Sequence, residues 1–125
     1  MKKVIIFLFC ALPLLLCCTC TNEQKNPPKV CNVDNPLTDL PWLKAIVDEI
    51  VLDVKNGNPL SVSIYQCIYG SNETGFLVEI GNMNPFYNCS GEILCIMGGV
   101  AGETCPELNI VKEKLIWETT KNQKE

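Results

Sequence analysis

The sequence predicts an α+β fold, in which one N-terminal amphipathic helix packs on a four- to five-stranded antiparallel sheet, after a cleaved signal peptide and a flexible tether. Three observations lead to this prediction. Hydrophobic side chains recur at helical spacing over residues 40–54, and the period changes to two from residue 60 onward. The chain has 125 residues, 47% of them hydrophobic and 19% charged, which is enough for one globular domain.

The predicted leader occupies residues 1–17. Lys2 and Lys3 form a basic start, and the apolar run "VIIFLFCALPLLL" over residues 4–16 has the length of a secretory signal. A membrane span needs about 20 apolar residues, and here the polar stretch "TNEQKNPPK" follows soon after the run. We therefore expect cleavage rather than a permanent transmembrane helix.

Residues 15–18, "LLCC", span the end of the leader and resemble a bacterial lipobox: an aliphatic residue three places before the cysteine, a small residue directly before it, and then Cys18. In this interpretation the sulfur of Cys18 carries diacylglycerol, with Cys20 as the alternative site. Durable anchoring needs two or more acyl chains, since each buried methylene contributes only about 0.8 kcal/mol. The lipobox predicts that the protein belongs to a bacterial cell envelope and is anchored to a membrane by its lipid. The domain would then be either periplasmic or exposed at the cell surface. An ordinary cleaved signal peptide is the alternative.

Residues 18–35 are predicted to be a flexible tether, because they are polar, contain Pro27 and Pro28 and carry almost nothing to bury. The mature chain is acidic. Cleavage removes two of the ten basic residues and none of the fourteen acidic ones, so the net charge becomes 8 − 14 = −6. Because such a surface repels phosphate backbones, we expect no nucleic-acid partner.

A single domain is expected over residues 36–119, and it begins with the helix. Thr38 or Asp39 is the expected N-cap, Pro41 fits the first turn, and "NGN" at 56–58 ends the helix. The stripe expected to face the core consists of Leu40, Leu43, Ile46, Val47, Ile50, Val51 and Val54.

Residues 60–70 and 75–83 are rich in β-branched and aromatic side chains, which predicts a hairpin with "SNET" as its turn. If Ser71 pairs with Thr74, one face of the hairpin packs on the helix. The residues expected on that face are Tyr65, Cys67, Tyr69, Phe76, Val78 and Ile80.

A second hairpin is predicted in "PFYNCSGEILCIM", with its turn at 90–91. The glycine-rich "GGVAG" at 98–102 lacks the lysine and hydroxyl of a phosphate-binding loop, so we expect a tight turn with positive φ. A short helix at 107–114, a final edge strand at 115–119 and a disordered tail at 120–125 complete the prediction.

The residue types argue against catalysis. The chain has no histidine, which removes imidazole-based triads, imidazole acid–base catalysis and the commonest zinc sites. Acidic pairs such as Asp48 with Glu49 lie on amphipathic elements, where a solvated face is expected. No CxxC motif is present in the domain. We therefore predict no catalytic residues, no cofactor, no metal site and no small-molecule substrate.

The disulfide candidates are Cys89, Cys95 and Cys105. In a regular hairpin Cys95 faces Phe86, which leaves the sulfurs of Cys89 and Cys95 about 10 Å apart, whereas a bridge needs Cα atoms within about 7 Å. We therefore expect Cys105 to be one partner, with either of the other two. Cys67, on a strand facing the core, is expected to be a buried free thiol.

The order "LPWLK", "SIYQCIYG", "YNCSGEILCIMGGVAGETCPEL" and "KEKLIW" after a lipoprotein-type leader resembles small Bacteroides-type lipoproteins that carry a domain of unknown function. The resemblance covers about residues 36–118, and residues 87–106 are its most specific part. It implies an envelope location and a small secreted-type domain, with Cys89, Cys95 and Cys105 in the family's motif. It points to no particular activity, because the domain's function is unknown. The chain departs from the family around "NMNPF", where relatives carry further cysteines.

These observations favour a non-enzymatic, lipid-anchored protein with a binding or assembly role. Its expected partners are a membrane, through the covalent lipid, and an envelope protein. The alternative is a small inhibitor of an envelope hydrolase, a protease or muramidase, with a reactive loop near "GNMNPFYN" at 81–88. A thiol enzyme is a third hypothesis, and it requires two exposed cysteines close together.

Overall fold

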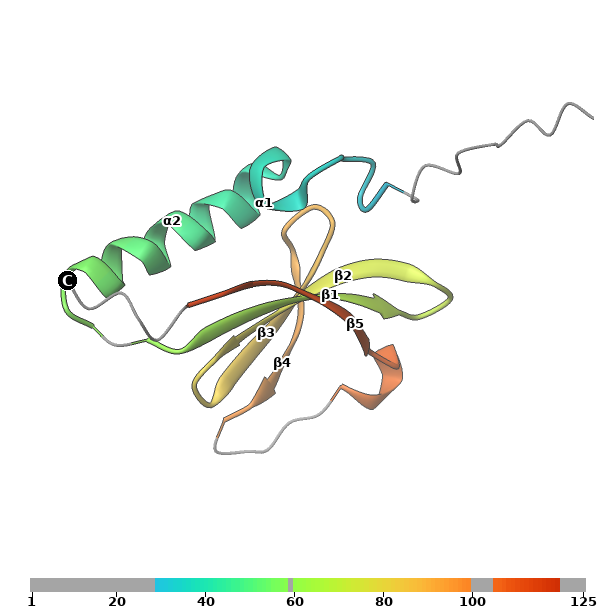
Figure 1. Ribbon diagram of the computed structural model, residues 1–125. Coiled ribbons are helices and arrows are strands. Elements are labelled where there is room, and N and C mark those ends of the chain that lie inside the picture. The colour runs from blue at the N-terminus through green and yellow to red at the C-terminus, as the bar shows by residue number, and fades with distance from the viewer. Residues whose placement is uncertain (1–28, 59, 100–104, 120–125) are drawn as a thin grey trace, which may run out of the picture.

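The computed structural model describes residues 29–58, 60–99 and 105–119. It confirms the predicted α+β class with a five-stranded antiparallel sheet, whose strand order is β4-β3-β2-β1-β5. One long helix lies along one face of the sheet (Figure 1). In chain order the elements are α1 (Pro36–Asp39), α2 (Pro41–Lys55), β1 (Val62–Tyr69), β2 (Glu73–Ile80), β3 (Met83–Asn88), β4 (Ile93–Gly98), the 3₁₀ turn η1 (Pro106–Leu108) and β5 (Val111–Glu118).

The helix begins differently from the prediction. Thr38 and Asp39 lie inside the short helix α1, whose N-cap is Asn35: the Asn35 side chain accepts a hydrogen bond from the Leu37 N–H at 3.2 Å. Leu40 then separates the two helices, because a residue before proline is held in extended backbone. The helix α2 ends at Lys55, and Gly57 follows with φ +88°, in agreement with the predicted stop.

The larger hydrophobic core joins the inner stripe of α2 to one face of the sheet. Leu43 is fully buried, and Ile50 is nearly so. Val30, Val33 and Trp42 pack against this cluster from its margin. The buried members of the cluster are Leu40, Leu43, Ile50, Val62, Ile64, Phe76 and Val78.

The register of the first hairpin differs from the prediction. Tyr69 pairs with Glu73, so the turn contains three residues, of which Gly70 and Asn72 have positive φ. This register moves the even-numbered residues of β1 onto the helix side, where Ile64 pairs with Val78. Of the predicted face, Phe76, Val78 and Ile80 do pack in the helix-side core, whereas Tyr65, Cys67 and Tyr69 lie in a second cluster.

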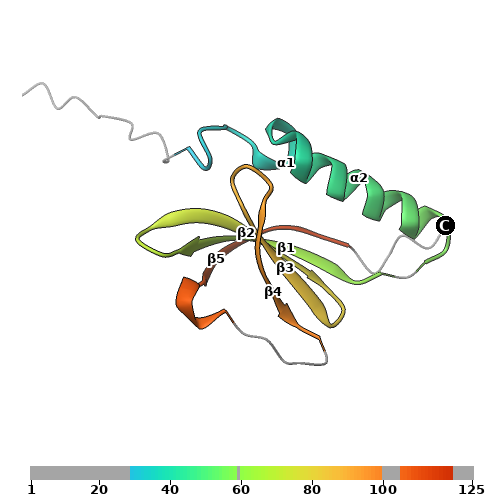
Figure 2. The same ribbon diagram turned by 180° about the vertical axis from the view of Figure 1, so that it is seen from behind.

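That second cluster lies on the opposite face of the sheet, where η1 is found (Figure 2). Cys67, Leu77 and Phe86 are its buried members. Leu108 of η1 packs against them, and its carbonyl oxygen accepts a hydrogen bond from the Gly70 N–H at 2.8 Å. The turn η1 therefore covers this face beside the end of β1.

The second hairpin forms as predicted, with Phe86 opposite Cys95 and the turn around Ser90 and Gly91. Its first strand, β3, lies between β2 and β4. Residues 83–88, which the inhibitor hypothesis assigned to a reactive loop, are therefore an interior strand.

The final strand begins earlier than predicted. Only Pro106–Leu108 form a helical turn, and Val111–Glu118 pair with β1 at the sheet edge. The expected helix at 107–114 is therefore wrong. Asn109 adopts a left-handed conformation, which ends the turn and redirects the chain into an extended conformation. Positive φ is found as expected at Gly98 and Gly99, and the rest of the glycine-rich loop lies outside the described residues.

The described chain starts inside the predicted tether. Val30 and Val33 form an isolated β-bridge and pack on the helix-side core, so this part of residues 18–35 belongs to the folded domain. The signal peptide, Cys18, Cys20 and the tail at 120–125 lie outside the described residues. Within residues 29–58, 60–99 and 105–119, no helix combines the length and the apolar character needed to cross a membrane.

Candidate functional site

A disulfide between Cys31 and Cys89 joins two distant segments at the surface of the domain. Their Cα atoms lie 5.4 Å apart across a sequence separation of 58 residues, so the bond fastens the N-terminal segment to the β3–β4 turn. Cys31 has positive φ, as does Asn32, which forms the tight turn that brings the sulfur into place. Cys31 was missing from the predicted disulfide candidates. The two valines around it, Val30 and Val33, were the available signal that this segment has something to bury.

Trp42 holds the same turn from the helix side. Its indole N–H donates to the carbonyl oxygen of Cys89 at 3.1 Å. The indole stacks on Tyr87, with ring centroids 5.2 Å apart, and meets Phe76 edge to face at 5.7 Å. Burial raises the pKa of the Tyr87 hydroxyl, which keeps this aromatic group neutral.

The turn itself is closed by one side chain. The amide oxygen of Asn88 accepts hydrogen bonds from the backbone N–H groups of Ser90 and Glu92, both at 3.0 Å, and from the Ser90 hydroxyl at 2.7 Å. Asparagine fits this position because its side-chain oxygen can accept hydrogen bonds from backbone N–H groups two or more residues further along the turn. The turn is therefore held by its own hydrogen bonds as well as by Cys31 and Trp42.

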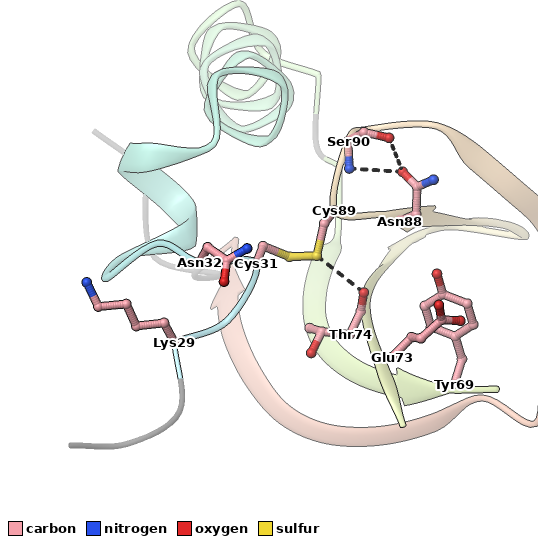
Figure 3. Close-up of a pocket in the computed structure, with 9 residues that line it drawn as sticks. All are labelled: Lys29, Cys31, Asn32, Tyr69, Glu73, Thr74, Asn88, Cys89 and Ser90. Atoms are coloured by element: carbon pink, nitrogen blue, oxygen red, sulfur yellow. Dashed lines mark hydrogen bonds between the residues drawn. A yellow bond between two sulfur atoms is a disulfide. The ribbon is translucent and has the colours of Figure 1, made fainter. Parts of the chain in front are cut away.

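Beside this disulfide lies a shallow pocket of about 450 Å³ (Figure 3). Lys29 and Asn32 lie on one side of the sulfur atoms, and Tyr69 and Glu73 lie on the other. Burial raises the pKa of the Tyr69 hydroxyl, as do the nearby carboxylates of Glu73 and Glu92. The remaining lining residues are Cys31, Thr74, Asn88, Cys89 and Ser90. The pocket offers hydrogen-bonding and charged groups for contact, without a nucleophile and base in contact with each other.

A larger groove of about 930 Å³ runs between the N-terminal segment and β5. Its lining mixes apolar side chains, such as Val33 and Leu115, with charges of both signs. It is lined by Lys29, Val30, Val33, Asp34, Asn35, Pro36, Leu37, Gln66, Glu113, Lys114, Leu115 and Ile116. The groove therefore presents hydrogen-bonding, charged and apolar groups side by side.

The second disulfide joins Cys95 to Cys105, with Cα atoms 6.5 Å apart. Cys105 is thus a disulfide partner, as expected, and of the two alternatives the structure selects Cys95. Because Cys105 immediately precedes η1, this bond fixes the start of the turn against β4.

Cys67 is a free thiol and is fully buried, as the sequence indicated. Burial raises its pKa to about 11, and this effect outweighs the opposing influence of a backbone hydrogen bond from Leu77 and of the charge on Lys112. Only the thiolate is a nucleophile, so Cys67 is inert near neutral pH. Over the ranges the structure covers, no three potential metal ligands come together.

Comparisons with models of protein families, with curated proteins and with solved structures found no match to this chain.

Proposed function

We propose that this chain is a lipid-anchored bacterial cell-envelope protein with a binding or assembly role and no catalytic activity. The observation that carries the proposal is the pair of disulfides, Cys31–Cys89 and Cys95–Cys105. Disulfides persist in oxidising compartments outside the cytosol. The secretory leader and the "LLCC" lipobox at residues 15–18 direct the chain to the same place.

The chemistry of the described surface supports a binding role. Of the five cysteines in this part of the chain, four are in disulfides, and Cys67 is buried with a raised pKa. The groove beside β5 and the pocket beside Cys31–Cys89 present mixed polar and apolar surface. For the alternative, a hydrolase inhibitor, the proposed reactive loop at 81–88 is largely strand β3, so no specific observation favours it.

The anchor is tested by metabolic labelling with a radioactive fatty acid in a bacterium that processes lipoproteins. The wild-type chain and Cys20→Ser should both be labelled, while Cys18→Ser should lose the label. Label that survives Cys18→Ser and disappears with Cys20→Ser would move the site to Cys20. An unlabelled wild-type chain would contradict lipid anchoring.

The binding role is tested by capturing partners from envelope extracts on the immobilised full chain. Specific recovery of a structural envelope protein supports the proposal. Recovery of a hydrolase whose activity falls on binding would replace it with the inhibitor hypothesis.

A further inference from the structure

The two edges of the sheet differ in charge. The strand β4 has no charged residue, and within the described ranges it is paired only with β3. The opposite edge, β5, has charges at four of its eight residues and two register shifts against β1. Charges and irregularities protect sheet edges from pairing with other strands. By this criterion β5 is protected. The ladder of β4 with β3 also has one register shift, between Phe86 and Tyr87, but its pairs from Met83–Gly98 to Phe86–Cys95 are regular. As far as the described residues show, this uncharged and regular stretch of β4 is open.

Among the described residues, the outer backbone groups of β4 have no hydrogen-bond partner. The Gly99 N–H donates to the carbonyl oxygen of Asn82 at 2.7 Å, and Gly98 pairs with Met83 in the same register. In an antiparallel ladder, hydrogen-bonded and non-hydrogen-bonded pairs alternate. The N–H and C=O groups of Ile96 and Gly98 therefore point away from β3, toward the open edge.

Exposed apolar side chains accompany this open backbone. Ile93 is 49% exposed and Ile96 is 37% exposed. Ile96 lies opposite Pro85, and Ile93 lies opposite Tyr87, which contacts Trp42 of the helix. The side chains of both isoleucines therefore lie on the helix side of the sheet, at its exposed β4 edge.

We propose that a second copy of this chain occupies this edge, with the two β4 strands paired antiparallel about a two-fold axis into one continuous sheet. The charge pattern lets two acidic copies meet at this edge without the repulsion that they would feel elsewhere. The chain has a formal net charge of −4, so two copies repel each other, yet Glu92 is the only charged residue between Met83 and Gly99. A two-fold axis brings the same surface of both copies together, so the nearly neutral hairpin of one copy meets the identical hairpin of the other. Two uncharged, apolar β4 strands can pair there without repulsion.

The inference goes beyond the proposed function and does not depend on the lipid anchor. The test is sedimentation equilibrium of the purified full chain over a range of concentrations, in density-matched detergent if the chain is lipidated. The variant Ile96→Lys puts a charge at the open edge, and Val111→Lys puts the same charge at the protected edge, where Val111 is 61% exposed.

We expect a concentration-dependent dimer for the wild-type chain and for Val111→Lys. In Ile96→Lys, like charges meet across the axis and the dissociation constant should rise by at least about tenfold. A wild-type chain that stays monomeric at every concentration would overturn the proposal. So would a dimer that Val111→Lys weakens as much as Ile96→Lys does.

Amide hydrogen exchange in the wild-type chain provides a measurement that does not depend on how the variants fold. The amides of Ile96 and Gly98 should exchange more slowly as the dimer forms, because they become hydrogen-bonded to the second copy. The Gly99 amide, already bonded to Asn82, is the internal control. Fast exchange of Ile96 and Gly98 in a sample that is fully dimeric would show that the dimer uses another surface.

Discussion

The indole N–H of Trp42 and the carbonyl oxygen of Cys89 are joined by a 3.1 Å hydrogen bond across 47 residues of sequence. Because Cys89 is also bonded to Cys31, this one turn connects the N-terminal segment, the first turn of α2 and the β3–β4 hairpin. We expect these three segments to unfold together.

Substitution of Trp42 tests this connection. In Trp42→Phe the hydrogen bond to Cys89 is lost while much of the aromatic contact is retained, so the free energy of unfolding should fall by about 1 kcal/mol. In Trp42→Ala the contacts with Tyr87 and Phe76 are lost as well, and the fall should be about 3–5 kcal/mol. Urea unfolding measures both. Leu52→Ala, on the exposed side of the same helix, is the control and should change stability by less than about 0.5 kcal/mol.

Gly91 tests how closely the turn approaches the indole. A Cβ atom at Gly91 would lie 2.6 Å from Cγ of Trp42, and φ is +84°. Gly81 also has positive φ, at +59°, but a Cβ atom there meets nothing within 4 Å. In Gly81→Ala the free energy of unfolding should fall by about 1–2 kcal/mol, the cost of a left-handed backbone conformation for alanine. In Gly91→Ala it should fall by about 1–3 kcal/mol more, because the new methyl group also collides with the indole. Equal losses in the two variants would argue against the indole contact.

The two disulfides should contribute unequally to stability. Cys31 and Cys89 close a loop of 58 residues, whereas Cys95 and Cys105 close one of 10. In the chain-entropy description, removing the first pair by double alanine substitution should lower the free energy of unfolding by about 4 kcal/mol, and removing the second pair by about 3 kcal/mol. Guanidinium unfolding compares the two variants. A Cys31→Ala, Cys89→Ala chain as stable as wild type would contradict the assigned bond.

Cys67 should make stability depend on alkaline pH. Burial raises its pKa from 9.0 to about 11, so the folded state binds its proton more tightly than the unfolded state does. The resulting stabilisation is fully present below pH 9 and is lost as the pH rises toward about 11. Cys67→Ala removes this contribution, so its stability should fall less steeply between pH 9 and pH 11 in urea unfolding. Parallel profiles for the two chains would place the thiol in a more solvated site.

Sequence reasoning recovered the fold class and both hairpins, because alternation and turn residues act locally. The pairing of Phe86 with Cys95 followed from a turn whose residues were identified correctly. In the first hairpin the prediction is right for the face of β2 and wrong for the face of β1, because pairing Ser71 with Thr74 assumes a two-residue turn. The actual turn contains three residues, which positive φ at Gly70 and Asn72 makes possible. The pairing register therefore shifts by an odd number of residues, so the face of β1 that packs on the helix is the opposite of the predicted one.

The disulfide of Cys31 could not be derived from local pattern. Its partner lies 58 residues away, and the segment around it is polar apart from Val30 and Val33. Long-range pairing depends on how α2 folds back over the sheet and brings residue 31 beside the β3–β4 turn. Cys95 and Cys105 lie only 10 residues apart. The sequence alone therefore identifies Cys105 as one disulfide partner and limits the other to Cys89 or Cys95.

Peptide mass mapping of the mature protein, isolated from bacterial envelopes without reduction, tests the central claim most directly. We expect an N-terminal peptide that starts at Cys18 and carries diacylglycerol. The same digest should contain Cys31 cross-linked to Cys89, Cys95 cross-linked to Cys105, and Cys67 alkylated only after denaturation. An N-terminus at Met1 together with free thiols at all four bridge positions would contradict the account of a lipid-anchored, disulfide-fastened envelope domain.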